Sequence, residues 1–149
     1  MARTETSILI SRPIEAVFAF VADPENLPRW AARTYDVTMT SAAPVTVGTT
    51  FLAVGRFLSQ RIESPQEVIE YEPNRQYALR SSSGPLAFVF RYALEPDGDG
   101  TKIVFVGEVQ SGVFFKLAEP IFADAVTLLC DTDLRRLKAL LEAVPNGSH

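Results

Sequence analysis

The segment Ser11–Trp30 reads SRPIEAVFAFVADPENLPRW and decides the fold, because it predicts two short helices back to back. We expect the first helix to begin at Ser11 or Arg12, with Pro13 in its first turn, where a missing backbone N–H costs nothing. Apolar residues then recur at helical spacing and give this helix one buried face. These residues are Val17, Phe18 and Val21.

The second helix is bounded by residues with clear conformational preferences. Asp23 is suited to cap it, and Pro24 is suited to its first position. We expect Pro28 to end this helix before Trp30, since proline lacks an N–H and disrupts a helix interior. The two short helices end on a large aromatic side chain, just before a run of strands. This feature restricts the possible folds more than any other feature of the chain.

The composition indicates one globular domain, which we place at residues 1–146. The chain has 149 residues, of which 47% are hydrophobic and 21% charged, an ordinary balance for such a domain. Its formal net charge of −4 argues against a nucleic-acid partner, which would require a basic surface. No apolar run reaches the roughly 18 residues of a membrane span, so we expect no integral membrane segment.

The sequence also predicts a cytoplasmic protein. Its single cysteine, Cys130, excludes an internal disulfide and is typical of a reducing compartment. The first residues lack the apolar core of a secretory signal. We interpret residues 147–149 as the remnant of an expression tag or a disordered tail, and we leave the oligomeric state open between a monomer and a homodimer.

After Trp30 the hydrophobic pattern alternates with a period of two, which is typical of strands. One strand is expected at residues 35–39 and another at residues 51–57. Residues 67–71 and 77–81 predict a hairpin with a turn between them. With a strand before Ser11, the predicted order is one strand, two short helices, about six strands and a long helix.

The clearest hairpin lies at residues 86–109, where apolar residues alternate along both strands. They are Leu86, Phe88, Phe90, Tyr92 and Leu94 on the first strand, and Ile103, Phe105, Gly107 and Val109 on the second. The register with Glu95 opposite Lys102 is the only one that places both sets on one face. It puts Gly107 opposite Phe90, where glycine either makes room for the ring or marks a bulge.

A long helix is predicted from about residue 116 to residue 143, with Pro120 in its first turns or at a kink. Its apolar stripe consists of Cys130, Leu134, Leu137, Leu141 and Val144. This helix is the only predicted element long enough to cover the apolar face of an antiparallel sheet. A sheet that curves around a helix leaves a gap lined by aromatic side chains, and we expect a cavity there of at least roughly 300 Å³.

The segment at residues 11–30 resembles the START/Bet v 1-like (SRPBCC) superfamily, and within it the polyketide cyclase/dehydrase-like branch. Further matching stretches are VGTTF at 47–51, EVIEYEPNR at 67–75, GDGTKI at 98–103 and LRRLKALLE at 134–142. The resemblance covers nearly the whole chain. Its opening motif is specific to a fold and not to an activity.

The resemblance implies an α+β helix-grip fold, in which a seven-stranded antiparallel sheet wraps around a long C-terminal helix and two small helices close one end. The family encloses an apolar cavity that binds lipids, steroids, polyketides or molecules like plant hormones. Some members are cyclases or aromatases, and many are carriers or sensors. The fold alone does not decide among these functions.

The chain lacks the residues that several kinds of catalytic site require. The one histidine, His149, is terminal, so no Ser-His-Asp or Cys-His arrangement can be built within the chain. Histidine and cysteine are too few for a zinc or iron site. The chain contains neither G-x-G-x-x-G nor G-x-x-x-x-G-K-[ST]. We therefore expect no cofactor and no metal.

The candidate ligand-binding residues are aromatic side chains that the pattern places toward the predicted cavity. They are Trp30, Tyr35, Phe51, Tyr77, Phe88, Phe90, Tyr92, Phe105 and Phe122. For Trp30 we favour a role as a plug in the core over a cap at the cavity mouth. We interpret Cys130 as an inert core thiol in preference to a reactive one.

Six charged residues could point either into the cavity or toward solvent, and for each we favour the orientation toward solvent. They are Arg56, Arg61, Glu63, Arg80, Asp124 and Asp131. An inward arginine or glutamate would orient a polar ligand group. An inward aspartate would act as an acid or base.

Three hypotheses for function follow. The first is a protein that binds a hydrophobic or amphipathic small molecule, such as a lipid, a polyketide or a steroid-like compound, between sheet and helix. The second is a cofactor-independent cyclase or dehydratase, which requires at least two ionisable or phenolic groups in the cavity. The third is a protein-interaction module, which requires an exposed apolar patch and no cavity.

Overall fold

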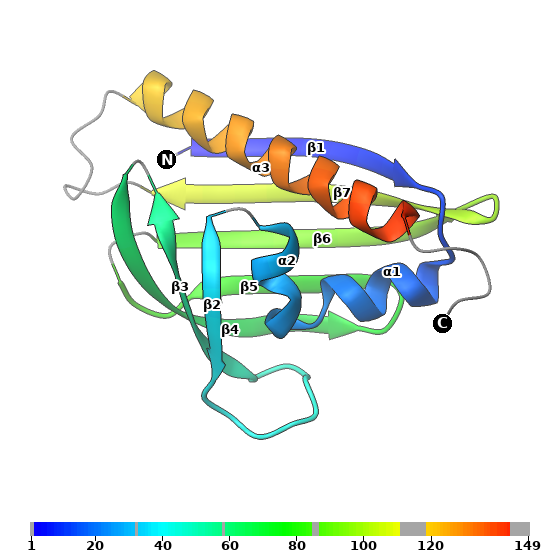
Figure 1. Cartoon of the computed structure of the whole chain (residues 1–149), viewed down its shortest axis with the longest axis horizontal. Coiled ribbons are helices and arrows are strands. Elements are labelled where there is room, and N and C mark those ends of the chain that lie inside the picture. The colour runs from blue at the N-terminus through cyan, green and yellow to red at the C-terminus, as the bar shows by residue number, and fades with distance from the viewer. Residues whose placement is uncertain (1, 32, 58, 85–86, 111–118, 144–149) are drawn as a thin grey trace.

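Seven antiparallel strands form one sheet, and three helices lie over its concave face (Figure 1). The computed structural model describes residues 2–31, 33–57, 59–84, 87–110 and 119–143. Its elements are β1 (Ala2–Ile10), α1 (Ile14–Val21), the 3-10 turn η1 (Pro24–Asn26), α2 (Leu27–Trp30), β2 (Thr34–Met39), β3 (Thr50–Phe57), β4 (Gln60–Glu72), β5 (Gln76–Ser81), β6 (Ala87–Asp97), β7 (Gly100–Gln110) and α3 (Glu119–Glu142). The strand order is β1-β7-β6-β5-β4-β3-β2. The predicted helix-grip architecture is confirmed.

The opening segment forms its predicted helices, with two corrections at prolines. Pro13 is the N-cap of α1 with an extended backbone, so that helix begins at Ile14, two residues after Arg12. Asp23 caps η1 as expected, by accepting a 3.0 Å hydrogen bond from the backbone N–H of Glu25. The prediction that Pro28 ends a helix before Trp30 is wrong. Pro28 lies in the first turn of the separate helix α2, where its missing N–H has no intrahelical partner to lose.

The β6–β7 hairpin has the predicted register. Glu95 opposes Lys102, and Phe90 opposes Gly107 without a bulge. A Cβ on Gly107 would lie 3.2 Å from the Phe90 ring, so the glycine makes room for the aromatic side chain. The ion pair between Glu95 and Lys102 spans 3.9 Å on the exposed face and contributes little to stability.

Helix α3 packs on the sheet mainly through its C-terminal half. Leu134, Leu137 and Leu141 of the predicted stripe are buried in the main core, and Cys130 is half-buried. Lys138 Nζ donates to the carbonyl oxygen of Leu9 at the end of β1, at 2.6 Å. The stripe residue Val144 and the start of the predicted helix at residue 116 lie outside the described residues, as do Leu86 and residues 147–149.

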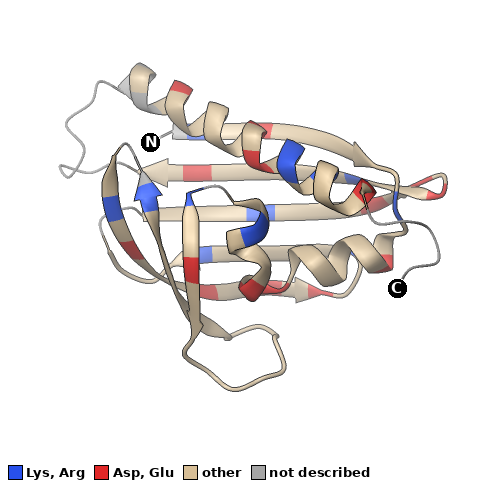
Figure 2. Cartoon of the chain, viewed as in Figure 1, with Lys and Arg blue, Asp and Glu red and all other residues tan. Residues whose placement is uncertain are grey.

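Charged residues of both signs are interspersed along the sheet and α3 of the described chain (Figure 2). None of its helices combines the length and hydropathy that a membrane-spanning helix needs. The absence of a nucleic-acid partner and the extent of the domain remain predictions.

Candidate functional site

A cavity of about 170 Å³ lies between the concave face of the sheet and α3. Its wall includes Leu27 of α2, Ala53 of β3, Leu79 of β5, Val109 of β7 and Val126 of α3. The cavity was expected, but it is smaller than the predicted 300 Å³, and aromatic rings from β6 and β7 form part of its wall.

Five of the nine predicted aromatic residues line this cavity. They are Trp30, Phe88, Phe90, Tyr92 and Phe105. The rings of Phe88 and Phe90 are stacked, with centroids 4.6 Å apart. The ring centroid of Phe90 lies 5.4 Å from that of Phe105. We call these five residues the aromatic wall. Mutual packing holds the rings of this wall in place and leaves their remaining faces toward the cavity.

Trp30 serves as a plug and as part of the wall at once. Its side chain is 3% exposed and belongs to the main core, and its ring meets Tyr92 edge to face at 6.1 Å. The described residues provide no hydrogen-bond partner for its buried indole N–H. As the one tryptophan of the chain, it reports on the cavity by its fluorescence.

Two other predicted aromatic residues lie elsewhere in the structure. Phe51 and Tyr77 are buried in the main core and are not part of the cavity wall. Burial raises the pKa of Tyr77 above its ordinary value. The side chain of Phe122, in the first turn of α3, lies outside the described residues.

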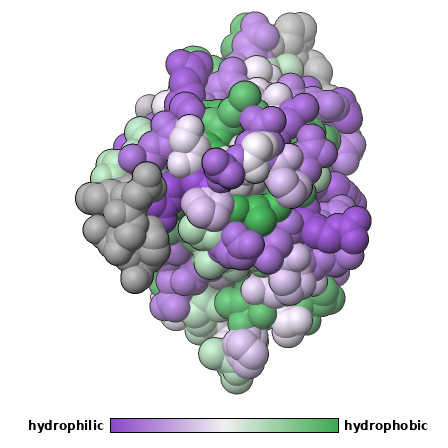
Figure 3. Space-filling model, turned by 90° about the vertical axis from the view of Figure 1, so that its right-hand side faces the viewer, coloured by the Kyte–Doolittle hydropathy of each residue, from purple (hydrophilic) through white to green (hydrophobic). Residues whose placement is uncertain are grey.

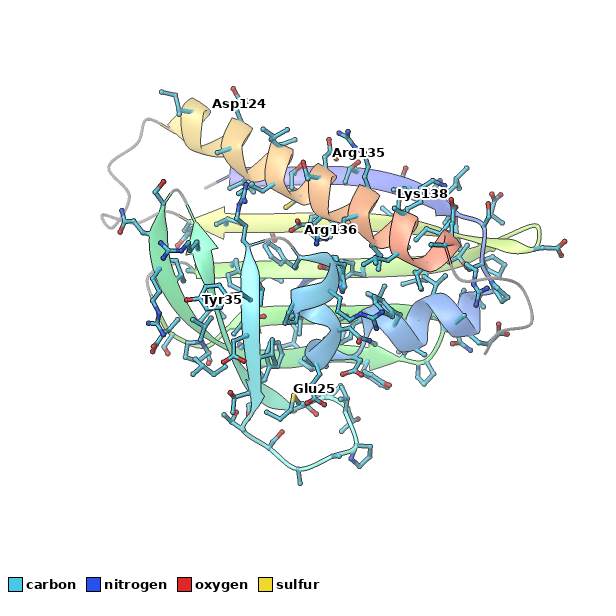
Figure 4. All side chains as sticks on the ribbon, viewed as in Figure 1. Glu25, Tyr35, Asp124, Arg135, Arg136 and Lys138 are labelled. Atoms are coloured by element: carbon cyan, nitrogen blue, oxygen red, sulfur yellow. The ribbon has the colours of Figure 1, made fainter. Side chains whose placement is uncertain are left out.

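The prediction for Tyr35 is wrong, since its side chain is 54% exposed. The register of β2 against β3 shifts between Thr34 and Asp36, which leaves Tyr35 as the extra residue of a bulge. A bulge redirects side chains relative to simple alternation. Tyr35 therefore lies on the surface of β2 and not in the cavity (Figure 4).

Gly55 makes the close approach of β3 to the start of β2 possible. The backbone N–H of Arg56 donates to the carbonyl oxygen of Arg33 at 2.7 Å, and a Cβ on Gly55 would overlap with that same oxygen. Arg33, Thr34, Gly55 and Arg56 all border the cavity. The glycine therefore shapes one end of the cavity.

Most of the six charged residues whose orientation the sequence did not decide lie at the surface. Arg61 pairs with Glu63 at 2.8 Å and Arg80 with Glu67 at 2.9 Å. Asp124 lies on the side of α3 that points away from the sheet (Figure 4). Asp131 is half-buried on α3 and is not part of the cavity wall. Arg56 is exposed and borders the cavity.

Sequence reasoning missed two polar side chains in the wall, Ser64 and Gln66 of β4. Both are buried, and Gln66 Nε2 donates to Ser64 Oγ at 3.3 Å. A signal for them was present, because they continue the inward alternation that Ile62 and Val68 define on the same strand. Their polarity made that alternation hard to recognise.

A third missed residue is Asp133 of α3, which lines the cavity with Tyr92 and Cys130. Burial raises the pKa of Cys130 to about 12, with Asp133 and Asp131 contributing. Burial also raises the pKa of Tyr92 well above its ordinary value. Both groups are therefore neutral at physiological pH, and the thiol is a poor nucleophile, which agrees with the interpretation of Cys130 as inert.

The described residues contain no group of three or more histidine, cysteine, aspartate or glutamate side chains that could hold a metal ion. The cavity thus offers apolar surface, neutral polar groups, and a few ionisable groups at its border. Such an arrangement can bind and orient a small molecule and can donate a hydrogen bond from the Tyr92 phenol.

Comparison with protein families gives one match over most of the chain. The model described as "Polyketide cyclase / dehydrase and lipid transport" matches residues 1–142. Comparison with curated proteins found no match.

Solved structures share the fold at low sequence identity. A START superfamily protein from Mycobacterium smegmatis is 13% identical, with a TM-score of 0.85, over 97% of this chain and 100% of that chain. TTHA0849 from Thermus thermophilus is 16% identical, with a TM-score of 0.80, over 95% of this chain and 97% of that chain. The di-domain ARO/CYC BexL from the BE-7585A biosynthetic pathway is 18% identical, with a TM-score of 0.75, over 98% of this chain and 48% of that chain.

Replacement of Gly55 by alanine is expected to destabilise the protein by about 1–3 kcal/mol, because the new methyl group meets backbone that cannot rotate away. The free energy of unfolding, measured with urea, tests this. Gly107→Ala is the matched control. Its Cβ would meet only aromatic rings, at 3.0–3.2 Å, which can yield, so the loss should be smaller. An equal or larger loss for Gly107→Ala would contradict the role assigned to Gly55.

Proposed function

The chain belongs to the polyketide cyclase/dehydrase and lipid transport family, and from this premise we propose that it binds a small, mostly apolar molecule in the cavity between the sheet and α3. The observation that carries the proposal is the aromatic wall, whose rings face a cavity of about 170 Å³. Burial of apolar ligand surface against such rings is favourable by about 25 cal/mol per Å².

The size of the cavity limits the ligand. An apolar cavity of about 150 Å³ accepts benzene, so the cavity as it stands suits a compound with a single ring. A lipid or a steroid would require side chains of the aromatic wall to move. We therefore narrow the first hypothesis to small aromatic or cyclic compounds.

A second candidate function has an observation of its own. Tyr92 and Asp133 lie in the wall of the same cavity, and the raised pKa keeps the Tyr92 hydroxyl protonated. A protonated phenol can donate to a carbonyl oxygen while a carboxylate accepts a proton, which is the chemistry of a cofactor-independent cyclase or dehydratase.

We do not propose the third hypothesis, a protein-interaction module, because it required an exposed apolar patch without a cavity. The face shown in Figure 3 carries small hydrophobic areas separated by hydrophilic residues. We place the protein in the cytoplasm as part of the proposal, since its one cysteine has no partner for a disulfide within the chain.

Benzene is expected to bind in the cavity, to change the emission of Trp30 and to raise the Tm by a few degrees at saturation. Cys130→Phe places a ring in the cavity and should abolish both effects. The control is Leu128→Phe on the exposed side of the same helix, where Leu128 is 63% exposed, and it should bind benzene like the wild type. Binding that survives in Cys130→Phe would place the site elsewhere.

If the protein is a cyclase or dehydratase, Tyr92→Phe should lower kcat on a small β-polyketone by roughly 100-fold and leave the affinity for benzene unchanged. Tyr77→Phe, which removes a buried hydroxyl outside the cavity, is the control. Unchanged turnover in Tyr92→Phe would remove Tyr92 from the mechanism.

A further inference from the structure

Ser64 and Gln66 form a buried polar pair in a largely apolar cavity wall. Their side chains are 9% and 8% exposed, and both line the cavity. They lie two residues apart on the inner face of β4, between Ile62 and Val68. Buried polar groups cost free energy unless each finds a hydrogen-bond partner.

The pair uses only part of its hydrogen-bonding capacity. The bond from Gln66 Nε2 to Ser64 Oγ is the one that either side chain makes among the described residues. A serine hydroxyl has one donor and a glutamine carbonyl has two acceptor sites. The Ser64 O–H donor and the Gln66 Oε1 acceptor therefore remain available.

The residues that lie opposite Ser64 and Gln66 on the neighbouring strands are uncharged. On the neighbouring strands, Ala53 lies opposite Ser64, and Phe51 and Ser81 lie opposite Gln66. The Ser81 hydroxyl oxygen accepts a 3.0 Å hydrogen bond from the backbone N–H of Phe88. A charged ligand group at this point would lose its hydration and would meet no opposite charge among these strand partners.

We propose that Ser64 and Gln66 bind a neutral hydroxyl group on an aromatic ligand, so that the natural ligand is a small phenol or a comparable hydroxylated ring. This inference rests on the proposed function and names the class of ligand. The ligand hydroxyl donates to Gln66 Oε1 and accepts from the Ser64 O–H, while its ring lies against the aromatic wall.

A hydroxyl group suits the pair better than other polar groups. It both donates and accepts, so it fits the pair in either orientation of the Gln66 amide. A carboxylate only accepts, and an ammonium group only donates, so neither can pair with both the Ser64 O–H donor and the Gln66 Oε1 acceptor. An ether or a ketone would leave Gln66 Oε1 unpaired.

Phenol and toluene test this inference, because they differ only by a hydroxyl in place of a methyl group. Both are titrated into the wild type, with Trp30 emission and calorimetry as readouts. The wild type should bind phenol at least as tightly as toluene, although water solvates phenol better. In Gln66→Met the affinity for phenol relative to toluene should fall roughly tenfold or more, because the hydroxyl loses its acceptor.

Two further variants keep the test decisive. Gln76→Met removes a glutamine of β5 that binds Glu70 at 3.0 Å and does not line the cavity, so its preference for phenol should equal that of the wild type. Ser64→Ala removes the hydroxyl donor with a minimal change in volume, and it replaces Gln66→Met if that variant does not fold.

The outcomes separate the two proposals. If toluene binds but the wild type prefers it tenfold or more over phenol, or if the preference for phenol survives both cavity variants, this inference is wrong and the proposed function stands. If neither compound binds, both proposals fail.

Discussion

The structure depends on the way a helix lies across a strongly twisted sheet. Helix α3 has 24 residues and is about 36 Å long, and it meets the main core through Leu134, Leu137 and Leu141. Nearer its N-terminus, Val126 belongs to a second, smaller apolar cluster with Ile62 and Val109. The cavity is lined by residues of both contacts, with Leu134 from the first and Ile62, Val109 and Val126 from the second.

The chemistry of the cavity follows from this geometry. The cavity is bounded by a helix on one side and a sheet on the other, and burial there keeps the Tyr92 phenol and the Cys130 thiol neutral. Polar groups that remain there, such as Ser64 and Gln66, act through hydrogen bonds and not through charge. The site is therefore suited to recognising a neutral molecule by its shape and by a few donors and acceptors.

The sequence allowed a good prediction of strands and helices wherever apolar residues followed a single clear alternation or a single helical spacing. The register of β6 against β7 followed from the requirement that Tyr92 and Phe105 share a buried face. The position of Tyr35 could not be predicted, because a bulge depends on how β2 meets β3 around Gly55. Ser64 and Gln66 were missed because polar residues on an inward face resemble the polar side of a surface strand. The volume of the cavity depends on ring rotamers and on the distance from helix to sheet, and neither is encoded in a hydrophobic pattern.

Xenon binding tests the central claim most directly, because an apolar cavity takes up this atom without any requirement for hydrogen bonds. A crystal of the protein pressurised with xenon should show the atom between Phe90, Leu79 and Val126, which line the cavity together. Electron density for xenon only at the surface, or side chains that fill this space, would contradict the account.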